Sequence, residues 1–171
     1  KYNGSTWEYV GEEDGISNSP ALGISFVIHK GNPYVAYTEQ QDTGPDKVIV
    51  QTYNGTTWES LGSHVAFTNN NATDLTVYEG TPYVAFAAPS TFQVAAYRFV
   101  GSGWDYLGSS ELRTMNSVSI DVYGGTPYVA ATSTAAQAVV AKRNGSTWEP
   151  LGQASLSKIT SERAVMKLEN G

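Results

Sequence analysis

The sequence predicts an all-β fold, a β-propeller of four-stranded antiparallel blades, with about three and a half blades in this chain of 171 residues. Two motifs that recur in the same order carry this prediction. The first, Asn-Gly-Ser/Thr-Thr-Trp-Glu, surrounds Trp7, Trp58 and Trp148, with a looser copy around Trp104. The second, Pro-Tyr-Val-Ala, occurs at Pro33, and its later copies follow after 49 and 45 residues. A repeat of this length is typical of propeller blades.

Each repeat is predicted to contain four short strands joined by tight turns. The first strand is expected at residues 23–29, 74–78 and 118–123. The second begins at each Pro-Tyr-Val-Ala, where proline in the first position removes no ladder hydrogen bond. The third is expected at 47–53, 93–99 and 138–143, and the fourth holds each tryptophan, the first of them at residues 6–10. Asn-Gly and Gly-Thr-Pro steps between these runs favour hairpins.

The second strand of each repeat is apolar on both faces, as in Tyr34-Val35-Ala36-Tyr37. Alternate residues of a strand point to opposite faces of the sheet. One packed face cannot bury such a strand, whereas a sheet lying between two neighbouring sheets can. We therefore expect the blades to stack around an axis, with the tryptophans as packing anchors between them.

We expect a single repeat domain over residues 1–171, with a partial blade at 1–21, blades at about 22–62, 72–108 and 117–152, and a partial blade at 162–171. Propellers usually have four to eight blades. The prediction therefore calls for further blades, either from a longer parent chain or from another copy of this chain. We favour the longer parent, because a blade assembled from two chain ends would lack its second and third strands.

The composition excludes several classes of function. There is no cysteine, which rules out disulfides and thiol chemistry. The net charge is −6, from 10 basic and 16 acidic residues, and this argues against nucleic acid as a partner. No apolar run approaches the ~18 residues of a membrane span, so no membrane insertion is expected. The first residues carry no signal peptide, a segment that mature secreted proteins have lost.

The blocks Asn-Gly-Ser-Thr-Trp-Glu and Gly-Thr-Pro-Tyr-Val-Ala resemble kelch-like and sialidase-like propeller repeats of secreted or surface-anchored bacterial proteins. The element Gly4, Thr6, Trp7 is similar to the second half of the sialidase Asp-box, Ser-x-Asp-x-Gly-x-Thr-Trp. Tyr2 occupies the position of the box aspartate, and Tyr53 or Arg143 does so in the later copies. The resemblance implies a secreted or cell-surface location and a shared architecture, without the complete box.

A row of varying residues on the first strand of each repeat is the main candidate site. In propellers this strand lines the central channel, where ligands usually bind. The row consists of Val27, Thr76, Asp121 and Lys167, between positions that stay apolar. We predict that Thr76, Asp121 and Lys167 bind the ligand, and Asp121 is the main candidate among them. The alternative is that they are ordinary solvated strand positions.

The loops from the fourth strand to the next first strand supply further candidates: Asn70, Asp74, Glu111 and Arg113. Clustered oxygens at residues 12–14 and 69–74 could hold calcium, which takes 6–8 oxygen ligands. Apart from calcium, no cofactor or metal is expected.

No catalytic residue is predicted. The acids that follow the tryptophans recur once per blade on the outer strand, at Glu8, Glu59, Asp105 and Glu149. Glycosidases need two carboxylates ~5–10 Å apart on either side of one sugar. Acids that occur once per blade on the outer strand cannot come together in this way. We interpret these acids, and His29 at a strand end, as structural.

The sequence favours a non-catalytic secreted or cell-surface module for binding or adhesion, with a glycan or a protein as its ligand. Carbohydrate is suggested by fold-level analogy. Two alternatives remain open: part of a propeller-fold glycosidase or lyase, and a purely structural or assembly module.

Overall fold

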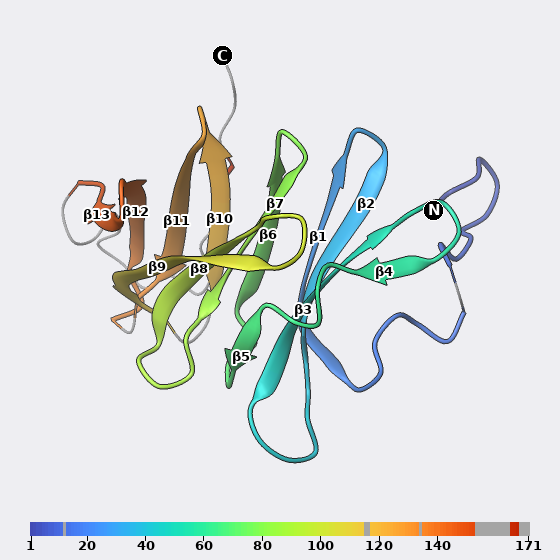
Figure 1. The fold of residues 1–171 in the computed structure, drawn as a ribbon, viewed down its shortest axis with the longest axis horizontal. Coiled ribbons are helices and arrows are strands. Elements are labelled where there is room, and N and C mark those ends of the chain that lie inside the picture. The colour runs from blue at the N-terminus through green and yellow to red at the C-terminus, as the bar shows by residue number, and fades with distance from the viewer. Residues whose placement is uncertain (12, 115–116, 134, 153–164, 168–171) are drawn as a thin grey trace.

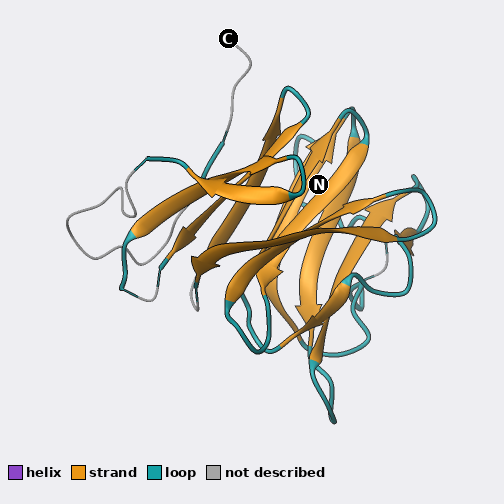
Figure 2. Ribbon diagram, turned by 60° about the vertical axis from the view of Figure 1, so that its left-hand side comes forward, coloured by secondary structure: helices purple, strands orange, loops and turns teal. Residues whose placement is uncertain are grey.

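The computed structural model describes residues 1–11, 13–114, 117–133, 135–152 and 165–167, and these residues contain strands and no helix (Figures 1 and 2). The strands form three separate antiparallel sheets. The first sheet contains β1 (Ala21–His29), β2 (Asn32–Glu39), β3 (Asp46–Tyr53), β4 (Trp58–Ser60) and β5 (Ala66–Thr68). The second contains β6 (Thr73–Tyr78), β7 (Thr81–Ala87), β8 (Gln93–Phe99) and β9 (Trp104–Arg113). The third contains β10 (Val118–Tyr123), β11 (Thr126–Thr132), β12 (Ala138–Asn144) and β13 (Thr147–Pro150).

In the second and third sheets consecutive strands are neighbours, and so are β1 to β4 of the first sheet, whereas β5 pairs with β3. The three sheets stand side by side like the leaves of a fan (Figure 1). Their first strands are adjacent, because β6 contacts both β1 and β10. The pairing register is the same in all three, since Val27, Thr76 and Asp121 each lie opposite the tyrosine of a Pro-Tyr-Val-Ala motif. Strands β1, β6 and β10 thus form the inner edge of the fan.

The apolar second strands are buried on both faces, as the sequence predicts. On β7, Val84 and Phe86 belong to a core shared with the first sheet. Tyr83 and Ala85, which point the other way, belong to a core shared with the third sheet. Burial of apolar surface between successive sheets is therefore the main force that holds them together.

The tryptophans form a repeated contact between successive blades. The Trp104 indole Nε1 donates to the carbonyl oxygen of Leu61 at 2.7 Å, and Trp148 Nε1 donates to that of Leu107 at 3.2 Å. Each carbonyl precedes a glycine, and a Cβ built on Gly108 would lie 3.5 Å from Trp148 Nε1. Each indole thus packs flat against the backbone of the preceding blade.

Two of the predicted strands differ in the structure. Residues 6–10 do not form a strand: only Tyr2 and Trp7 pair, as an isolated bridge. The reason is that a fourth strand is held by pairing with a third strand along its length, and the isolated bridge is the only strand-type pairing of this segment among the described residues. Strand β9 is longer than predicted and includes Glu111 and Arg113, which were expected in a loop.

The predicted last strand, at residues 163–168, lies mostly outside the described residues. Of this stretch the structure describes 165–167, which are not in a strand.

Candidate functional site

The inner strands β1, β6 and β10, together with residues 165–167, line an open groove of about 520 Å³. Four of the predicted site residues lie along it: Asp74, Thr76, Asp121 and Lys167. The same groove contains Ser25 on β1 and Ser119 on β10, which the sequence prediction did not include. The first strands of successive repeats therefore bring together residues that are about one repeat apart in the sequence.

A repeated hydrogen bond joins the strands along this groove. The backbone N–H of Leu75 donates to Ser25 Oγ at 3.1 Å. One blade further, the N–H of Ile120 donates to Asp74 Oδ2 at 2.9 Å. The N–H of Met166 then donates to Ser119 Oγ at 3.1 Å. The same bond thus joins β6 to β1, β10 to β6, and Met166 to β10. Met166 therefore lies next to β10 in the way that β10 lies next to β6.

Asp74 is the centre of this network. Its Oδ1 accepts a hydrogen bond from the Ser25 hydroxyl at 2.6 Å, and its Oδ2 accepts one from the Ser119 hydroxyl at 3.0 Å. With the Ile120 N–H, one carboxylate therefore receives three hydrogen bonds from the two neighbouring strands. Charge-assisted hydrogen bonds of this kind are stronger than neutral ones, so they fix the relative positions of the three strands.

Local backbone geometry allows β1 to approach Asp74 this closely. Gly23 lies at a register irregularity of β1, with a φ of 58°. A Cβ at this position would lie 1.9 Å from the carbonyl oxygen of Asn71, so only glycine fits. The close passage of β1 past Asn71 brings Ser25 beside Asp74.

Asp121 lies two residues further along the row. Its Oδ1 accepts hydrogen bonds from the Thr76 hydroxyl at 3.1 Å and from the Val122 N–H at 2.8 Å. Thr76 and Asp121 occupy equivalent positions of neighbouring strands, as the sequence alignment predicts. Lys167 also lines the groove. The row therefore presents carboxylate, hydroxyl and ammonium groups side by side.

One wall of the groove is apolar and exposed. On β1, the fractional exposure is 66% for Ile24 and 57% for Phe26. The equivalents of Phe26 on the next inner strands, Leu75 and Ile120, are buried. Because Phe26 alternates with Ser25 and Val27, which face the second sheet, its exposed ring lies on the opposite face of β1.

The other predicted residues lie away from the groove. Asn70 is buried in the turn before β6, where its Oδ1 accepts a hydrogen bond from the Ala72 N–H. Glu111 and Arg113 lie near the end of β9, the outermost strand of its sheet. Asp74, the first residue of the strand predicted at 74–78, is the second residue of β6.

A signal for the missed serines exists in the sequence. Ser25, Asp74 and Ser119 form a second column, two residues before Val27, Thr76 and Asp121. Since alternate residues of a strand share a face, a polar column two positions from the predicted row belongs to the same side.

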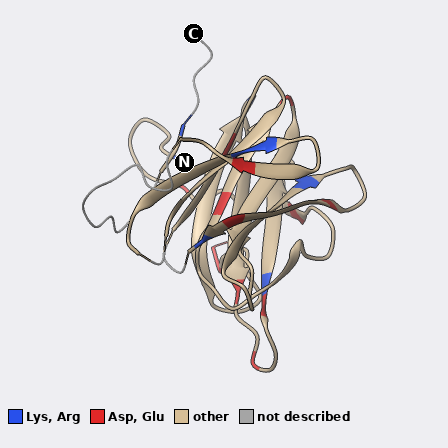
Figure 3. Cartoon of the chain, turned by 90° about the vertical axis from the view of Figure 1, so that its left-hand side faces the viewer, with Lys and Arg blue, Asp and Glu red and all other residues tan. Residues whose placement is uncertain are grey.

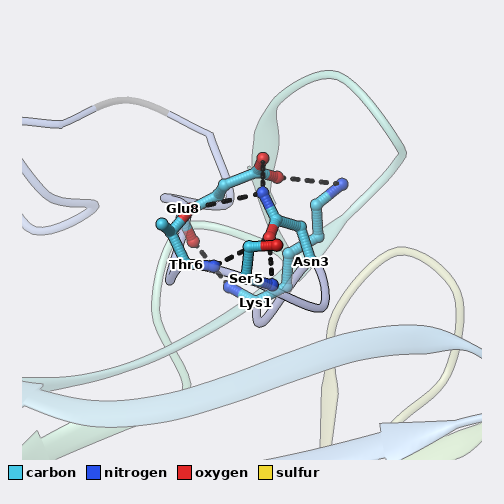
Figure 4. A network of polar contacts seen from close by, with 5 residues as sticks. All are labelled: Lys1, Asn3, Ser5, Thr6 and Glu8. Atoms are coloured by element: carbon cyan, nitrogen blue, oxygen red, sulfur yellow. Dashed lines mark hydrogen bonds and ion pairs between the residues drawn. The ribbon is translucent and has the colours of Figure 1, made fainter.

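The acids that follow the tryptophans support turns, as expected. Asn3 Oδ1 accepts hydrogen bonds from the N–H groups of Ser5 and Thr6, both at 2.9 Å, and its amide donates to Glu8 (Figure 4). Asn54 makes the same contacts, with Glu59 as the acid. The motif is therefore a self-contained turn in which the carboxylate holds the asparagine.

Among the described residues, no three His, Asp or Glu side chains come together as a metal site requires. The described residues likewise contain no helix long and apolar enough to cross a membrane. Charged side chains are scattered over the sheets rather than gathered in one block (Figure 3).

This fold, a fan of four-stranded antiparallel sheets around an inner groove, is that of a β-propeller. No protein-family model matches the sequence, and no curated protein is similar to it. Solved structures are similar in fold. A glycosyl hydrolase from Bacteroides ovatus matches with a TM-score of 0.56 and 12% identity, over 85% of this chain and 52% of its own.

Two further structures widen the comparison. An exo-β-1,3-galactanase from Phanerochaete chrysosporium, solved with β-1,3-galactotriose, has a TM-score of 0.57 and 12% identity, over 88% of this chain and 41% of its own. A fucose lectin from Kordia zhangzhouensis, in complex with methyl-fucoside, has a TM-score of 0.53 and 10% identity, over 77% of this chain and 99% of its own. This chain spans about half the length of the bacterial glycoside hydrolases to which it is similar in fold, the one from Bacteroides ovatus among them. At identities this low, the structural similarity shows the fold alone: the chain forms part of a propeller.

Proposed function

We propose that this propeller binds carbohydrate without cleaving it, in the groove along β1, β6 and β10. The observation that carries the proposal is the combination found there. Polar side chains are fixed by hydrogen bonds between strands, in one open groove that the apolar residues Ile24 and Phe26 also line. Ligand sites in proteins usually pair apolar or aromatic walls with a few well-placed polar groups.

The chemistry of the groove suits a sugar. Saccharide hydroxyls both donate and accept hydrogen bonds, and Asp121, Thr76 and Lys167 offer both kinds of partner. The C–H face of a sugar ring is apolar and suits the apolar residues that also line the groove. The volume of about 520 Å³ falls within the ~300–1,000 Å³ of typical ligand sites.

The fold comparisons support carbohydrate as the ligand class by analogy. Two of the similar structures contain a sugar, galactotriose in the galactanase and methyl-fucoside in the lectin. Fold alone does not fix function, so the choice of binding over cleavage depends on the groove. Both oxygens of Asp74 accept hydrogen bonds from protein groups, which suits a structural carboxylate rather than a proton donor or nucleophile.

A glycan array followed by calorimetric titration tests this proposal. We expect Asp121→Asn to weaken binding of the best glycan by about tenfold or more, because it removes a charged acceptor. Asp42→Asn, on the exposed β2–β3 connection, is the matched control and should leave binding unchanged. No binding on the array, or equal affinities for the two variants, would contradict the proposal.

Glycoside cleavage is the second candidate, and a specific observation favours it. Asp74 and Asp121 are two carboxylates that line one groove, the arrangement from which glycosidases build acid and base. Release of reducing ends from a glycan panel, by this chain and by any longer parent, separates the two functions. Turnover that Asp121→Asn leaves unchanged would discard Asp121 as a catalytic group.

We also propose a secreted or cell-surface location, where extracellular glycans are accessible. The repeat resemblance supports this location. Cell fractionation with an antibody to the chain would test it, and recovery in the cytosolic fraction alone would contradict it.

A further inference from the structure

A second cavity, separate from the groove, lies between the second and third sheets at the ends of β8 and β12. Its volume is about 190 Å³, and Arg98, Arg143, Tyr83 and Pro127 are among its lining residues. None of its lining residues lines the groove. Tyr83 and Arg98 also line a wider hollow of about 640 Å³ beside it, which gives the cavity access from outside.

Two guanidinium groups meet in this cavity. Arg143 Nη1 is buried and has no hydrogen-bond partner among the described residues. A buried donor without a partner is costly, especially a charged one. Burial, and in second place the positive charge of Arg98, lower the pKa of Arg143 below its usual value.

Arg98 is only partly satisfied by its neighbour. Its Nε and Nη2 donate to Asp105 Oδ2, at 3.4 and 3.2 Å. Asp105 thus accepts hydrogen bonds from Nε and Nη2 of Arg98. Arg98 Nη1 has no carboxylate partner in the part of the chain that the structure describes. The two arginines therefore carry two positive charges beside the single carboxylate of Asp105, in a protein whose net charge is −6.

We propose that this cavity binds an oxyanion, a carboxylate or sulfate group, at the guanidinium groups of Arg143 and Arg98 that line it. Arginine is the side chain best suited to such groups, because its planar N–H donors match two oxygens at once. The cavity equals about six water volumes, at ~30 Å³ each. This is enough for one acidic group with some water and too little for an oligosaccharide, so any larger ligand would extend into the wider hollow.

The proposal is independent of carbohydrate binding in the groove. The anion could be a free inorganic ion or the acidic substituent of a larger molecule such as a uronic acid. Sulfate and glucuronate probe these two sources, and glucose is the uncharged control. Binding of either anion supports the site and identifies the source; binding of neither would overturn it.

The readout is the arginine side-chain N–H signals in ¹⁵N-labelled protein, together with the midpoint of thermal unfolding. We expect sulfate or glucuronate to shift the Arg143 and Arg98 signals saturably at millimolar concentration. Sulfate also stabilises proteins in general by exclusion from their surface, so the midpoint is compared between variants at equal ionic strength. Arg143→Gln and Arg98→Gln should each weaken the anion-specific effect by about tenfold or more.

Lys142→Gln is the matched control, since it removes a positive charge next to Arg143 from outside the cavity lining. It should bind the anion like the unchanged protein. Equal anion responses in all four proteins would overturn the proposal. If Arg143→Gln does not fold, the Arg98→Gln variant and the signals of the unchanged protein still decide it.

Discussion

Trp7 and Trp148 occupy the same position of the same motif, yet their surroundings differ. Trp7 is 81% exposed, whereas Trp148 is 9% exposed. The turns that hold them share the bond from asparagine to the following glutamate, made by Asn3 in the first copy and by Asn144 in the last. The turn is therefore a local structure that the motif forms by itself, while burial of the tryptophan comes from the neighbouring blade.

The different exposure of Trp7 and Trp148 shows that the turn residues of the motif and its tryptophan have separate roles. The asparagine and glutamate close a hairpin without tertiary contacts. The indole contacts the preceding sheet, where it donates to a carbonyl and covers a glycine, as Trp104 does at Leu61 and Gly62. Removing the indole should therefore destabilise the fold only where a preceding sheet lies beneath it.

The largest expected effect is that of Trp148→Ala. Loss of a buried large aromatic costs about 3–5 kcal/mol of unfolding free energy. Trp7→Ala is the matched control, and as a surface substitution it should stay within about 0.5 kcal/mol. Denaturant titration measures both. Losses of similar size would show that the indoles do not join the blades.

Gly11→Ala tests the other side of the contact. The φ of Gly11 is 92°, and a Cβ there would lie 2.8 Å from Trp58 Cδ1. We expect a loss of about 2–3 kcal/mol, from the left-handed backbone and from displacement of the indole. Gly4 has a φ of 104° and nothing near its Cβ position, so Gly4→Ala should cost only about 1–2 kcal/mol. Equal losses of stability in Gly11→Ala and Gly4→Ala would show that the contact between residue 11 and the Trp58 indole contributes nothing.

Trp104→Phe isolates the hydrogen bond. It keeps an aromatic ring and leaves the Leu61 carbonyl without its donor, which should cost about 1–3 kcal/mol. Trp7→Phe should cost nothing measurable. A Trp104→Phe protein as stable as the unchanged one would indicate that packing alone accounts for the contact.

The smallest effect concerns alkaline pH. Tyr37 lies on the face of the first sheet covered by Ile16 and Trp58. Burial, and then the charge of Glu39, raise its pKa from 10.0 to about 12. The unfolded chain therefore loses the Tyr37 proton first, so this contribution to stability is complete below pH 10 and falls as pH rises to about 12.

Tyr37→Phe should flatten that part of the pH dependence of unfolding. The difference in tyrosinate absorbance between the folded protein and its Tyr37→Phe variant isolates the titration of Tyr37 from that of the other tyrosines. A normal titration of Tyr37 in the folded protein would show that its face of the sheet is open to water.

The propeller could be predicted because its determinants are local and repeated. Each Pro-Tyr-Val-Ala motif indicates a strand that is apolar on both faces, and Trp104 and Trp148 each indicate a contact with the preceding blade. Strand ends could not be predicted in this way, because pairing decides them. Thr73 belongs to β6 through its register opposite Phe86, and Arg113 belongs to β9 through its register opposite Gln93.

The candidate site was predicted in part for the same reason. Thr76 and Asp121 follow from the repeat alignment, since equivalent residues of adjacent strands lie side by side. Ser25 and Ser119 gain their role only from hydrogen bonds across blades, to Asp74 and to the Met166 backbone. Such bonds depend on how close the sheets approach, which Gly23 sets by its contact with Asn71.

Fluorine NMR of protein labelled with 5-fluorotryptophan tests the stacking of the blades most directly. Of the four tryptophans, only Trp7 should show the full change in chemical shift between light and heavy water, and that signal should vanish in Trp7→Phe. The signals of Trp58, Trp104 and Trp148 should be dispersed and respond weakly. Four signals with equal, full solvent response would contradict the account, because the sheets would then not lie against one another.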